Sequence, residues 1–338
     1  MHNSRQNIKV AVAFNQPTQS TNDDGDFISE EAVIDEAKAV YAALTELNHD
    51  VQYFPINNIV ENMIQLKQFE PGVIFNLCEG YRGKAYYESH ITGLWEIMGI
   101  PYTGNKPLTL GISLDKALTK KLFESKKIPT PIFQVFKKTP EKTYLKFPLI
   151  VKPCGEDASL GITQDSIVQN FEQMRKIVEL LLEKYKQPVL VEQYIEGREF
   201  NISILGNNPP KVLAISEIDF SLVGERYYPI TSYEAKWLKD HPLYNNTPAI
   251  CPAKISSELT DKLSDTALRV YSLLGGRDYG RVDMRVTASD SIYVLEFNPN
   301  PDISPDAGFA RAINNVNMSY TQFVDFLLQE AMDRKEND

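Results

Sequence analysis

Cysteine and histidine are scarce in this sequence, which has three cysteines and four histidines among 338 residues. The cysteines, Cys78, Cys154 and Cys251, are odd in number and far apart, which excludes a disulfide scaffold and a cysteine-rich zinc site. The scattered histidines lack the spacing of metal ligands. This cysteine usage is typical of a reducing compartment, so we expect a cytoplasmic protein.

Long apolar runs and a surplus of basic residues are also missing. No apolar run approaches the roughly 18 residues that span a bilayer, and the net charge is −10. Proteins that bind nucleic acid normally show a basic surplus or a basic stripe. The opening residues, MHNSRQNIKVAVAF, contain only a short apolar stretch, which predicts a first strand and not a signal peptide. We therefore expect neither a membrane nor a nucleic acid as a partner.

The first third of the chain alternates strand-like with helix-like segments. This order favours an α/β unit with a parallel sheet and right-handed crossovers. In such sheets ligands bind beyond the carboxyl ends of the strands. Ser29 is placed to cap the first helix. Strands are predicted over residues 8–14, 51–55 and 73–77, and helices over 30–47, 59–69 and 87–98.

The remaining sequence predicts two further units of mixed α and β structure. We place an N-terminal domain at 1–104, a small central domain at 105–187 and a C-terminal domain at 188–338. Helices are predicted over 115–127, 171–185, 257–274 and 320–332, and strands over 149–152, 189–194, 201–205, 212–218, 281–286 and 292–297, with a long loop over about 222–252.

Polar residues alternate with apolar ones in the predicted hairpin of residues 281–297, as in half-buried strands. Asp283, Glu296 and Asn298 are hard oxygen ligands that would share one face, which suits Mg²⁺. Arg281 would lie on the same face, where it could neutralise a phosphoryl group or an oxyanion. A surface hairpin with salt bridges would show the same pattern, so the hairpin alone leaves both interpretations open.

Two other segments have features of a nucleotide site. In VKPCGEDASLGI, residues 151–162, Lys152 ends an apolar strand and a loop of small residues follows, which lets backbone N–H groups approach phosphates. In VLVEQYIEGREF, residues 189–200, Glu192 and the strand edge could bind an adenine, and Glu199 could bind a ribose. Taken singly, the first segment is better explained as an ordinary turn, and the second as a charged strand end.

Taken in order, the motifs resemble a known family. LDKALTKKLF, VKPCGEDASLGI, VEQYIEGREF, SYEAKW, GRVDMRV and LEFNPNP follow one another as in the ATP-grasp superfamily, and within it as in the D-alanine–D-alanine ligase family. The resemblance covers residues 8 to about 332. It implies an ATP-grasp fold with an N-terminal Rossmann-like parallel-sheet domain. Members of the family are often dimers through the first domain, although no dimer surface can be identified in this sequence.

The resemblance also implies roles for the matching positions. Lys236 would reach the phosphates from a mobile loop, Arg281 would stabilise the acyl-phosphate and the tetrahedral intermediate, and Glu30 would contact the amino group of the first substrate. Two Mg²⁺ ions, for which Mn²⁺ could substitute, would bind Asp283, Glu296 and Asn298. The residues implied to bind ATP are Lys116, Lys152, Ser159, Glu192, Gln193, Tyr194, Ile195 and Glu199.

The implied reaction joins a small carboxylate to an amine, with amino acids or peptide-like molecules as substrates. The carboxylate attacks the γ-phosphate of ATP and becomes an acyl-phosphate, and the amine then expels phosphate. Positioning and charge neutralisation contribute most of the catalysis in phosphoryl transfer. A closed loop would keep water from the acyl-phosphate.

The substrate positions differ from the family pattern. Glu79 and Arg82 follow the third strand where the family has a histidine, Asp302 stands at the position of a glycine, and Ala307 stands at that of a serine that grips a carboxylate. Asp306 adds a second acid. Acids near a bound carboxylate would repel it.

We therefore expect an acceptor other than D-alanine, which is either cationic or holds its carboxylate elsewhere, with Arg82, Lys84 and Arg311 as candidates to bind it. The alternatives are a true D-alanine–D-alanine ligase of cell-wall synthesis and an ATP-binding protein that has lost catalysis. Retention of Arg281, Asp283, Glu296 and Asn298 argues against the second alternative.

Overall fold

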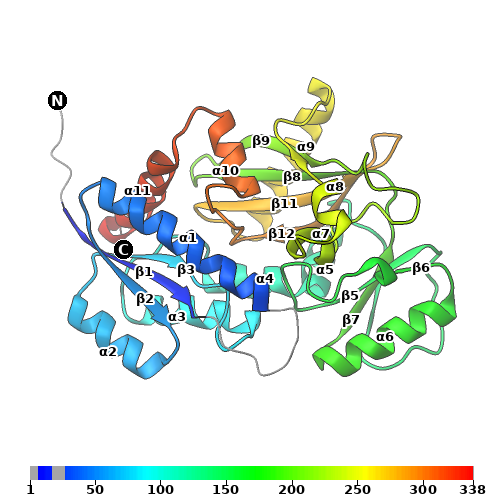
Figure 1. The fold of residues 1–338 in the computed structure, drawn as a ribbon, viewed down its shortest axis with the longest axis horizontal. Helices are drawn as coiled ribbons and strands as arrows, with labels where there is room; N and C mark the ends of the chain where they lie inside the picture. The colour runs from blue at the N-terminus through cyan, green and yellow to red at the C-terminus, as the bar shows by residue number, and fades with distance from the viewer. Residues whose placement is uncertain (1–6, 17–26, 338) are drawn as a thin grey trace.

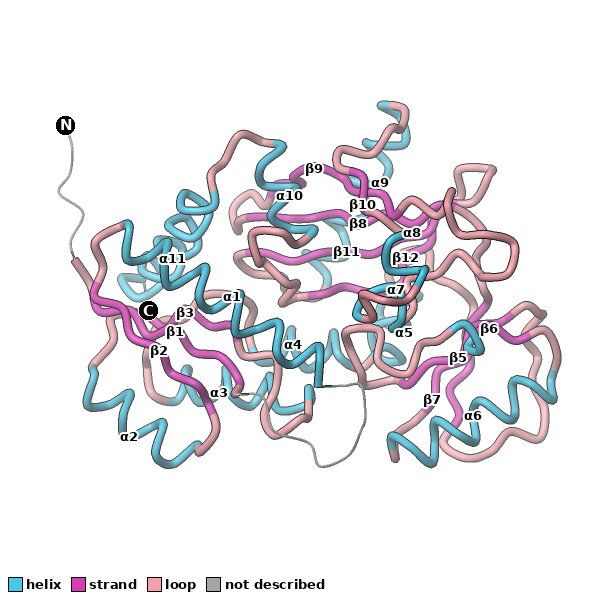
Figure 2. The backbone as a smooth tube through the Cα atoms, viewed as in Figure 1, coloured by secondary structure: helices cyan, strands magenta, loops and turns pink. Residues whose placement is uncertain are grey.

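The computed structural model describes residues 7–16 and 27–337, and describes side chains over 7–16 and 32–334. Three sheets stand apart in the ribbon, each with its own helices (Figures 1 and 2). No helix in these ranges is both long enough and apolar enough to cross a membrane.

The first sheet is parallel, as the alternation of strands and helices predicts. Its strand order is β2-β1-β3, and buried valine, alanine and phenylalanine side chains fill both of its faces. The prediction that Ser29 caps the first helix is wrong, because the helix begins at Phe27 and Ser29 has helical backbone. The elements are β1 (Lys9–Asn15), α1 (Phe27–Glu46), β2 (Asp50–Ile56), α2 (Ile59–Phe69), β3 (Val73–Leu77), η1 (Ala85–Tyr87) and α3 (Glu88–Ile97).

The largest sheet is antiparallel and has the strand order β10-β9-β8-β11-β12. One face packs on α9 (Ser257–Leu273) through Leu263, Ala267 and Val270, and the other face is polar. The expected loop over 222–252 is wrong in part, because it contains α7 (Tyr233–Trp237), α8 (Pro242–Asn246) and β10, which are too short for a periodic pattern. The strands are β8 (Arg198–Leu205), β9 (Lys211–Ile218), β10 (Ala249–Ile250), β11 (Tyr279–Val286) and β12 (Ile292–Asn298).

The small central sheet has the order β4-β7-β5-β6 and is covered by α6 (Phe171–Tyr185). β7 pairs with both β4 and β5, so the strand just beyond residue 187 belongs to this sheet. Two helices, α4 (Pro107–Leu114) and α5 (Lys116–Ser125), precede it. The other elements are β4 (Phe133–Phe136), β5 (Leu149–Pro153), η2 (Gln164–Ser166), β6 (Ile167–Val168) and β7 (Val189–Gln193).

The last two helices, α10 (Gly308–Asn315) and α11 (Tyr320–Asn337), return the chain to its beginning. α10 packs against β9, and α11 packs against α1 and β3 (Figure 1). One continuous apolar core therefore contains Val10 and Val40 from the first domain together with Phe309 and Leu327 from the end of the chain.

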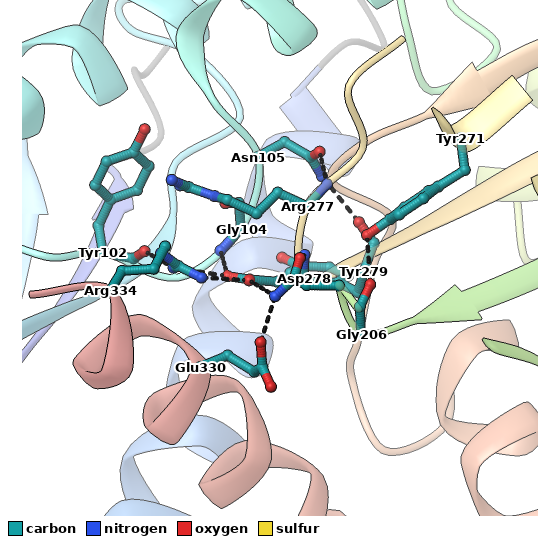
Figure 3. Close-up of polar contacts among 11 residues, drawn as sticks. Tyr102, Gly104, Asn105, Gly206, Tyr271, Arg277, Asp278, Tyr279, Glu330 and Arg334 are labelled. Carbon is teal, nitrogen blue, oxygen red and sulfur yellow. Dashed lines mark hydrogen bonds and ion pairs between the residues drawn. The ribbon is translucent and has the colours of Figure 1, made fainter. Parts of the chain in front are cut away.

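A buried polar cluster joins the domains where β11 begins (Figure 3). Asp278, which is 0% exposed, accepts hydrogen bonds from the backbone N–H of Gly104 at 2.8 Å and from Asn207 Nδ2 at 3.0 Å. Arg334 of α11 donates to both carboxylate oxygens of Asp278, at 2.6 and 3.0 Å, and to the carbonyl of Tyr102 at 2.7 Å. The cluster therefore fixes the first domain, α11 and the large sheet relative to one another.

Candidate active site

Polar side chains form two rows across the open face of the large sheet. Because side chains alternate between the faces of a strand, the residues that face α9 are apolar and their neighbours face away from it. Residues that are opposite in register lie side by side across the strands. The first row is Ser216, Asn201, Asp283 and Glu296, and the second is Ser203, Arg281 and Asn298.

Three of the hairpin residues predicted to lie together, Arg281, Asp283 and Asn298, are in direct contact. Arg281 donates from Nε and Nη2 to the two oxygens of Asp283, at 2.7 and 2.8 Å. Asn298 Nδ2 donates to Asp283 Oδ2 at 2.9 Å, and Asn201 Nδ2 donates to Oδ1 at 2.7 Å. Burial raises the pKa of Asp283 despite the guanidinium of Arg281 beside it. The hairpin therefore forms a compact charged cluster and not a set of separate surface pairs.

Lys116 extends this cluster from the first turn of α5. Its Nζ lies 3.4 Å from Glu296 Oε2 and 3.5 Å from Asp157 Oδ1, and it donates to the carbonyl of Glu156 at 2.5 Å. Burial favours the neutral form of Glu296, but the charges of Lys116, Lys152 and Arg281 prevail and lower its pKa to about 2. Glu296 is therefore a carboxylate at any pH in which the protein would work.

Glu192 lies between two buried lysines. Its Oε1 is 2.5 Å from Lys152 Nζ and its Oε2 is 2.6 Å from Lys120 Nζ, and Lys120 also donates to Thr130 Oγ1 at 2.8 Å. Burial would raise the pKa of Glu192, but the two ammonium groups lower it. The sequence reasoning did not identify Lys120, although it lies four residues after Lys116 and therefore on the same side of α5.

Glu199, the expected ribose ligand, is held by a residue that the sequence reasoning also missed. Arg285 Nη2 donates to Glu199 Oε2 at 2.8 Å, and its Nη1 donates to the carbonyl of Ile195 at 3.0 Å. Thr231 Oγ1 donates to the other oxygen of Glu199 at 2.7 Å. Arg285 follows Arg281 and Asp283 on the same face of β11, and this alternation could have revealed it.

A cavity of about 540 Å³ lies between the small sheet and the polar face of the large sheet. Thirteen predicted residues line it or its edge. Ser159, on the small-residue loop, donates to the carbonyl of Thr231 at 3.0 Å, and Lys236 comes from α7. Burial and the charge of Arg281 lower the pKa of Lys236. The predicted residues that line the cavity are Lys152, Ser159, Glu192, Gln193, Tyr194, Ile195, Glu199, Lys236, Arg281, Asp283, Glu296 and Asn298, with Lys116 in contact with Glu296 at its edge.

A second cavity of about 320 Å³ meets the first at Lys236, Arg281 and Asn298. Its walls include the predicted residues Glu79 and Asp302. Four further acids line it that were not predicted, and two of them, Glu36 of α1 and Glu88 of α3, lie on helices of the first domain.

Glu36 and Glu88 are buried, and each holds part of the loop after β12. Glu36 Oε1 accepts from the N–H of Ile303 at 2.8 Å, and Glu88 Oε1 accepts from Asn300 Nδ2 at 3.0 Å. Burial, with the charge of Asp302, raises the pKa of Glu36 well above its usual range, and burial with Asp157 does the same for Glu88.

Three predicted substrate residues are not placed in these cavities. Arg82 is exposed, and its Cζ lies over the ring of Tyr81, 5.1 Å from the ring centroid. Asp306 is exposed in the loop before α10. Neither lines either cavity. Glu30 has helical backbone in α1, but its side chain lies outside the described residues.

The hairpin offers a suitable donor set for Mg²⁺. In the described ranges no three histidine, cysteine or acidic side chains form a metal-binding group. Asp283 and Glu296 are nevertheless directly opposite in register, and Asn298 adds an amide oxygen from the next row. Mg²⁺ commonly takes only one or two carboxylates and completes its octahedron with water and phosphate oxygens, so this set fits it.

Comparisons with known proteins agree on one family. The family model described as "D-ala D-ala ligase C-terminus" matches residues 121–329. Uncharacterized protein y4sG of Sinorhizobium fredii strain NGR234 is 34% identical over 304 residues, which are 87% of each chain. D-alanine–D-alanine ligase of Desulforamulus reducens is 32% identical over 314 residues, 88% of this chain and 93% of that protein.

Solved structures show the same fold. D-alanine–D-alanine ligase from Bacillus anthracis has a TM-score of 0.78 at 22% identity, over 98% of this chain and 99% of that one. The same enzyme complexed with ATP has a TM-score of 0.76 at 20% identity, over 98% and 99%. The predicted ATP-grasp fold with an N-terminal parallel-sheet domain is confirmed. On the family model, the relatives and the fold together, this chain belongs to the D-alanine–D-alanine ligase family of ATP-grasp ligases.

Proposed function

We propose that the protein is an ATP-dependent carboxylate–amine ligase, cytoplasmic and ADP-forming, whose acceptor differs from D-alanine. The observation that carries the proposal is the meeting of two cavities at Arg281 and Lys236. One cavity has the features of a nucleotide site, and the other is a small polar chamber for substrates. Two reactants bound on either side of Arg281 would meet beside one guanidinium, which is the arrangement that a transfer reaction needs.

ATP would lie in the larger cavity. The base would bind beside Glu192 and Ile195, the ribose beside Glu199, and the phosphates beside Lys152 and Lys116. Asp283, Glu296 and Asn298 would hold Mg²⁺, which neutralises phosphate oxygens when it is bound. The low pKa of Glu296 supports this assignment, because a metal ligand must be ionised.

The reaction would proceed in two steps. A carboxylate oxygen of the donor forms a bond to the γ-phosphorus as the bond to the β–γ bridging oxygen breaks, which releases ADP and leaves an acyl-phosphate. The amine nitrogen of the acceptor then attacks the acyl carbon, and the C–O bond to phosphate breaks. Phosphate leaves, and the amine loses a proton to give the amide. Arg281 would stabilise the oxyanion of the second step.

The acids of the smaller cavity favour an acceptor other than D-alanine. Asp302 stands in the loop after β12, and Glu36, Glu79 and Glu88 share its chamber. A plain amino acid would bring its carboxylate toward Asp302 and Glu79, and close like charges repel at low effective dielectric. The raised pKa of Glu36 and of Glu88 favours their neutral forms, so these two acids contribute little to the repulsion. An acceptor with an added positive charge, or one that directs its carboxylate away from Asp302, avoids this repulsion.

A true D-alanine–D-alanine ligase is the second candidate. Curated relatives with that name match at 30–32% identity over 87–88% of this chain. Identity at this level supports shared chemistry, but it leaves the few residues that touch the acceptor free to differ.

The test is phosphate release from Mg-ATP in the presence of paired donors and acceptors. The panel contains D- and L-amino acids, dipeptides and diamines, and mass spectrometry identifies each product. We expect phosphate and a new amide with a pair other than D-alanine with D-alanine. Rapid D-alanyl-D-alanine synthesis would contradict the altered specificity and establish the second candidate.

A donor assay without any acceptor separates chemistry from specificity. Hydroxylamine traps an acyl-phosphate as a hydroxamate, so its formation from donor and Mg-ATP reports the first step alone. Absence of both hydroxamate and amide, together with tight ATP binding, would contradict ligase activity and favour a non-catalytic ATP-binding protein.

A further inference from the structure

A third cavity, which we call the outer groove, lies outside the candidate active site. Its volume is about 1420 Å³, against about 540 and about 320 Å³ for the two cavities described above. One wall is formed by η1, α4 and α5, and the other by β4, the loop over residues 137–142 and the residues that follow α6. Sites for small molecules usually have volumes of about 300–1,000 Å³. The outer groove is therefore large enough for an extended chain.

The outer groove continues the smaller cavity of the candidate active site. The two share residues 83–85 after β3, and they share Glu156 and Tyr185 on the side of the small sheet. The smaller cavity in turn meets the larger one at Lys236 and Arg281. These shared walls form one path, which leads from the outer groove through the smaller cavity to the place where the phosphates of ATP are proposed to lie.

The charge of the outer groove is opposite to that of the whole chain. The net charge of the protein is −10, but six lysines and only three acids line the groove. Two of the acids are engaged, because Asp115 accepts from the N–H of Leu118 at 2.9 Å and Glu156 accepts from Gln187 Nε2 at 2.5 Å.

The six lysines are exposed, and in the described part of the chain none of them forms an ion pair. A concave surface that carries mainly one sign of charge attracts ligands of the opposite sign. The outer groove therefore favours an anionic ligand. Its lysines are Lys84, Lys121, Lys137, Lys138, Lys142 and Lys186.

The outer groove also presents apolar side chains. Leu118 of α5 is 42% exposed and Tyr86 of η1 is 56% exposed, and both line the groove. Val135 and Phe136 of β4 add half-buried apolar surface. This combination fits a peptide that has both carboxylates and apolar side chains. A nucleic acid fits less well, because a chain with a net charge of −10 repels a polyanion that is longer than the groove.

We propose that the outer groove binds the body of an acidic peptide, and that the C-terminal carboxylate of this peptide is the donor that reacts in the smaller cavity. This inference rests on the proposed ligase function and names the class of its donor. The peptide is then lengthened at its C-terminus.

Electrostatics decides which end of the peptide enters first. The path from the basic groove ends at Arg281, so a carboxylate is attracted at both ends of the path, whereas an ammonium group would be repelled at both. The amide N–H groups of the peptide can donate hydrogen bonds to Glu79 and Asp302, which line the smaller cavity between them. A peptide therefore suits the chamber acids better than a free amino acid with a second nearby carboxylate.

The test uses hydroxamate formation with Mg-ATP and hydroxylamine, which requires no acceptor. The donors are free D- and L-alanine and the N-acetylated peptides Glu-Leu-Glu-Ala and Gln-Leu-Gln-Ala, each made with L- or D-alanine at its end. Mass spectrometry locates the hydroxamate. We expect the KM of the acidic peptide to be about 10-fold or more below that of the neutral peptide, because each exposed ion pair contributes up to about fivefold. High salt should reduce this difference, since it screens exposed charges.

A double variant tests the lysines of the groove. Lys138→Gln together with Lys142→Gln should raise the KM of the acidic peptide about 3- to 10-fold, and should leave kcat and the KM of the neutral peptide unchanged. The matched control is Lys146→Gln together with Lys176→Gln, which changes two exposed lysines of the small domain that line none of the three cavities. The control should keep the wild-type difference between the two peptides.

A charge placed in the groove provides a second test. Leu118→Glu adds a carboxylate at an exposed position of α5 and should also raise the KM of the acidic peptide, whereas Leu180→Glu, at an exposed position of α6 outside the three cavities, should not. The inference is overturned if the two peptides have equal KM values, if groove and control variants behave alike, or if alanine forms a hydroxamate and neither peptide does.

Absence of hydroxamate from every donor would instead contradict the proposed function. Calorimetric titration of the two peptides into wild-type protein that is saturated with Mg²⁺ and a non-hydrolysable ATP analogue then tests the groove without turnover. Tighter binding of the acidic peptide, lost in the Lys138 and Lys142 double variant, supports the groove as a binding site, and equal affinities overturn it.

Discussion

Lys120 Nζ lies 2.6 Å from Glu192 Oε2, and both side chains are 1% exposed. Lys152 occupies the other oxygen of Glu192, so one carboxylate balances part of the charge of two ammonium groups in the interior. Without Lys120, Glu192 would keep Lys152 as its counter-charge, but its Oε2 would lose its buried partner, and an unsatisfied buried acceptor destabilises a protein. The position beside the proposed adenine site connects this pair to nucleotide binding.

Lys120→Met should lower the free energy of unfolding by about 1–3 kcal/mol and weaken binding of an ATP analogue. The matched control is Lys121→Met, which changes the adjacent exposed lysine of α5. Chemical denaturation and calorimetric titration measure the two effects. Equal stability of the two variants would show that Lys120 does not balance Glu192.

Glu296→Gln should lower the rate of phosphate release by about 100-fold or more, because a charged group that neutralises or holds phosphoryl charge is lost. The apparent affinity for Mg²⁺ should fall at the same time. Glu258→Gln is the control, since Glu258 is exposed on α9 and pairs only with Lys262 in the contacts described. An unchanged Mg²⁺ requirement in the Glu296 variant would exclude Glu296 as a ligand.

Glu36→Gln should stabilise the protein at neutral and higher pH. Burial raises the pKa of Glu36 in the folded state, so its contribution to stability is complete below the unfolded pKa, near 4.5, and is lost as the pH rises through the folded pKa. Glutamine keeps an acceptor for the N–H of Ile303 without this loss. Stabilising changes of this kind contribute about 0.5–2 kcal/mol.

Melting temperatures of wild type and Glu36→Gln, measured from pH 4.5 to 8.5, test this expectation. The melting temperature of Glu36→Gln should exceed that of the wild-type protein by a margin that grows with pH. The control Glu61→Gln, at an exposed position of α2, should show no such trend. A constant difference between wild type and Glu36→Gln across the range would contradict the assignment.

Asp302→Gly should improve the use of D-alanine as an acceptor by about tenfold or more. The substitution removes a carboxylate from the smaller cavity and so removes a repulsion of the order expected for near charges. Asp306→Gly changes a nearby acid that lines neither cavity and serves as the control. Mass spectrometry of the products measures how well each variant uses D-alanine as an acceptor. Equal effects of the two substitutions would contradict a local role for Asp302.

Asp278→Asn should destabilise the protein by about 3–5 kcal/mol, because it leaves Arg334 without its buried counter-charge. Asparagine tolerates the positive φ of 64° at this position, so backbone strain does not contribute to the result. Asp261→Asn, on the exposed side of α9, is the control. Denaturation of the two variants provides the comparison, and the expectation fails if they are equally stable.

The regular elements could be predicted wherever a clear period extends over several residues. The bounds of α2, β3 and α6 match the prediction, because each has an apolar pattern and a clear end. β4, β6 and β10 were missed, since strands of two to four residues have too few positions to show a period. β8 begins at Arg198 and not at residue 201, because its first two residues, Arg198 and Glu199, are both charged and hide the strand pattern.

The residues of the site were predicted less completely than the regular elements. Lys152 and Asp283 were named from their motifs, whereas Lys120, Arg285 and Glu36 were not, although Lys120 and Arg285 lie within the motifs LDKALTKKLF and GRVDMRV. Each of these three acts on a partner that is far away in the chain, and the separation is 86 residues for Arg285 and Glu199 and 267 for Glu36 and Ile303. The alternation on β11 could have marked Arg285, and the spacing on α5 could have marked Lys120, but neither pattern records which distant residue is the partner, so only the fold reveals the contact.

The shared core of the two chain ends has a consequence for synthesis. Val10 and Val40 pack in one cluster with Leu327 and Ala331, so the first domain lacks part of its interior until the end of the chain has left the ribosome. Domains usually fold as they are made, from the N-terminus onward. In this protein the nascent first domain keeps part of its apolar surface exposed until α11 has been synthesised. A chain that stops before residue 320 lacks α11 and could not complete the core of the first domain.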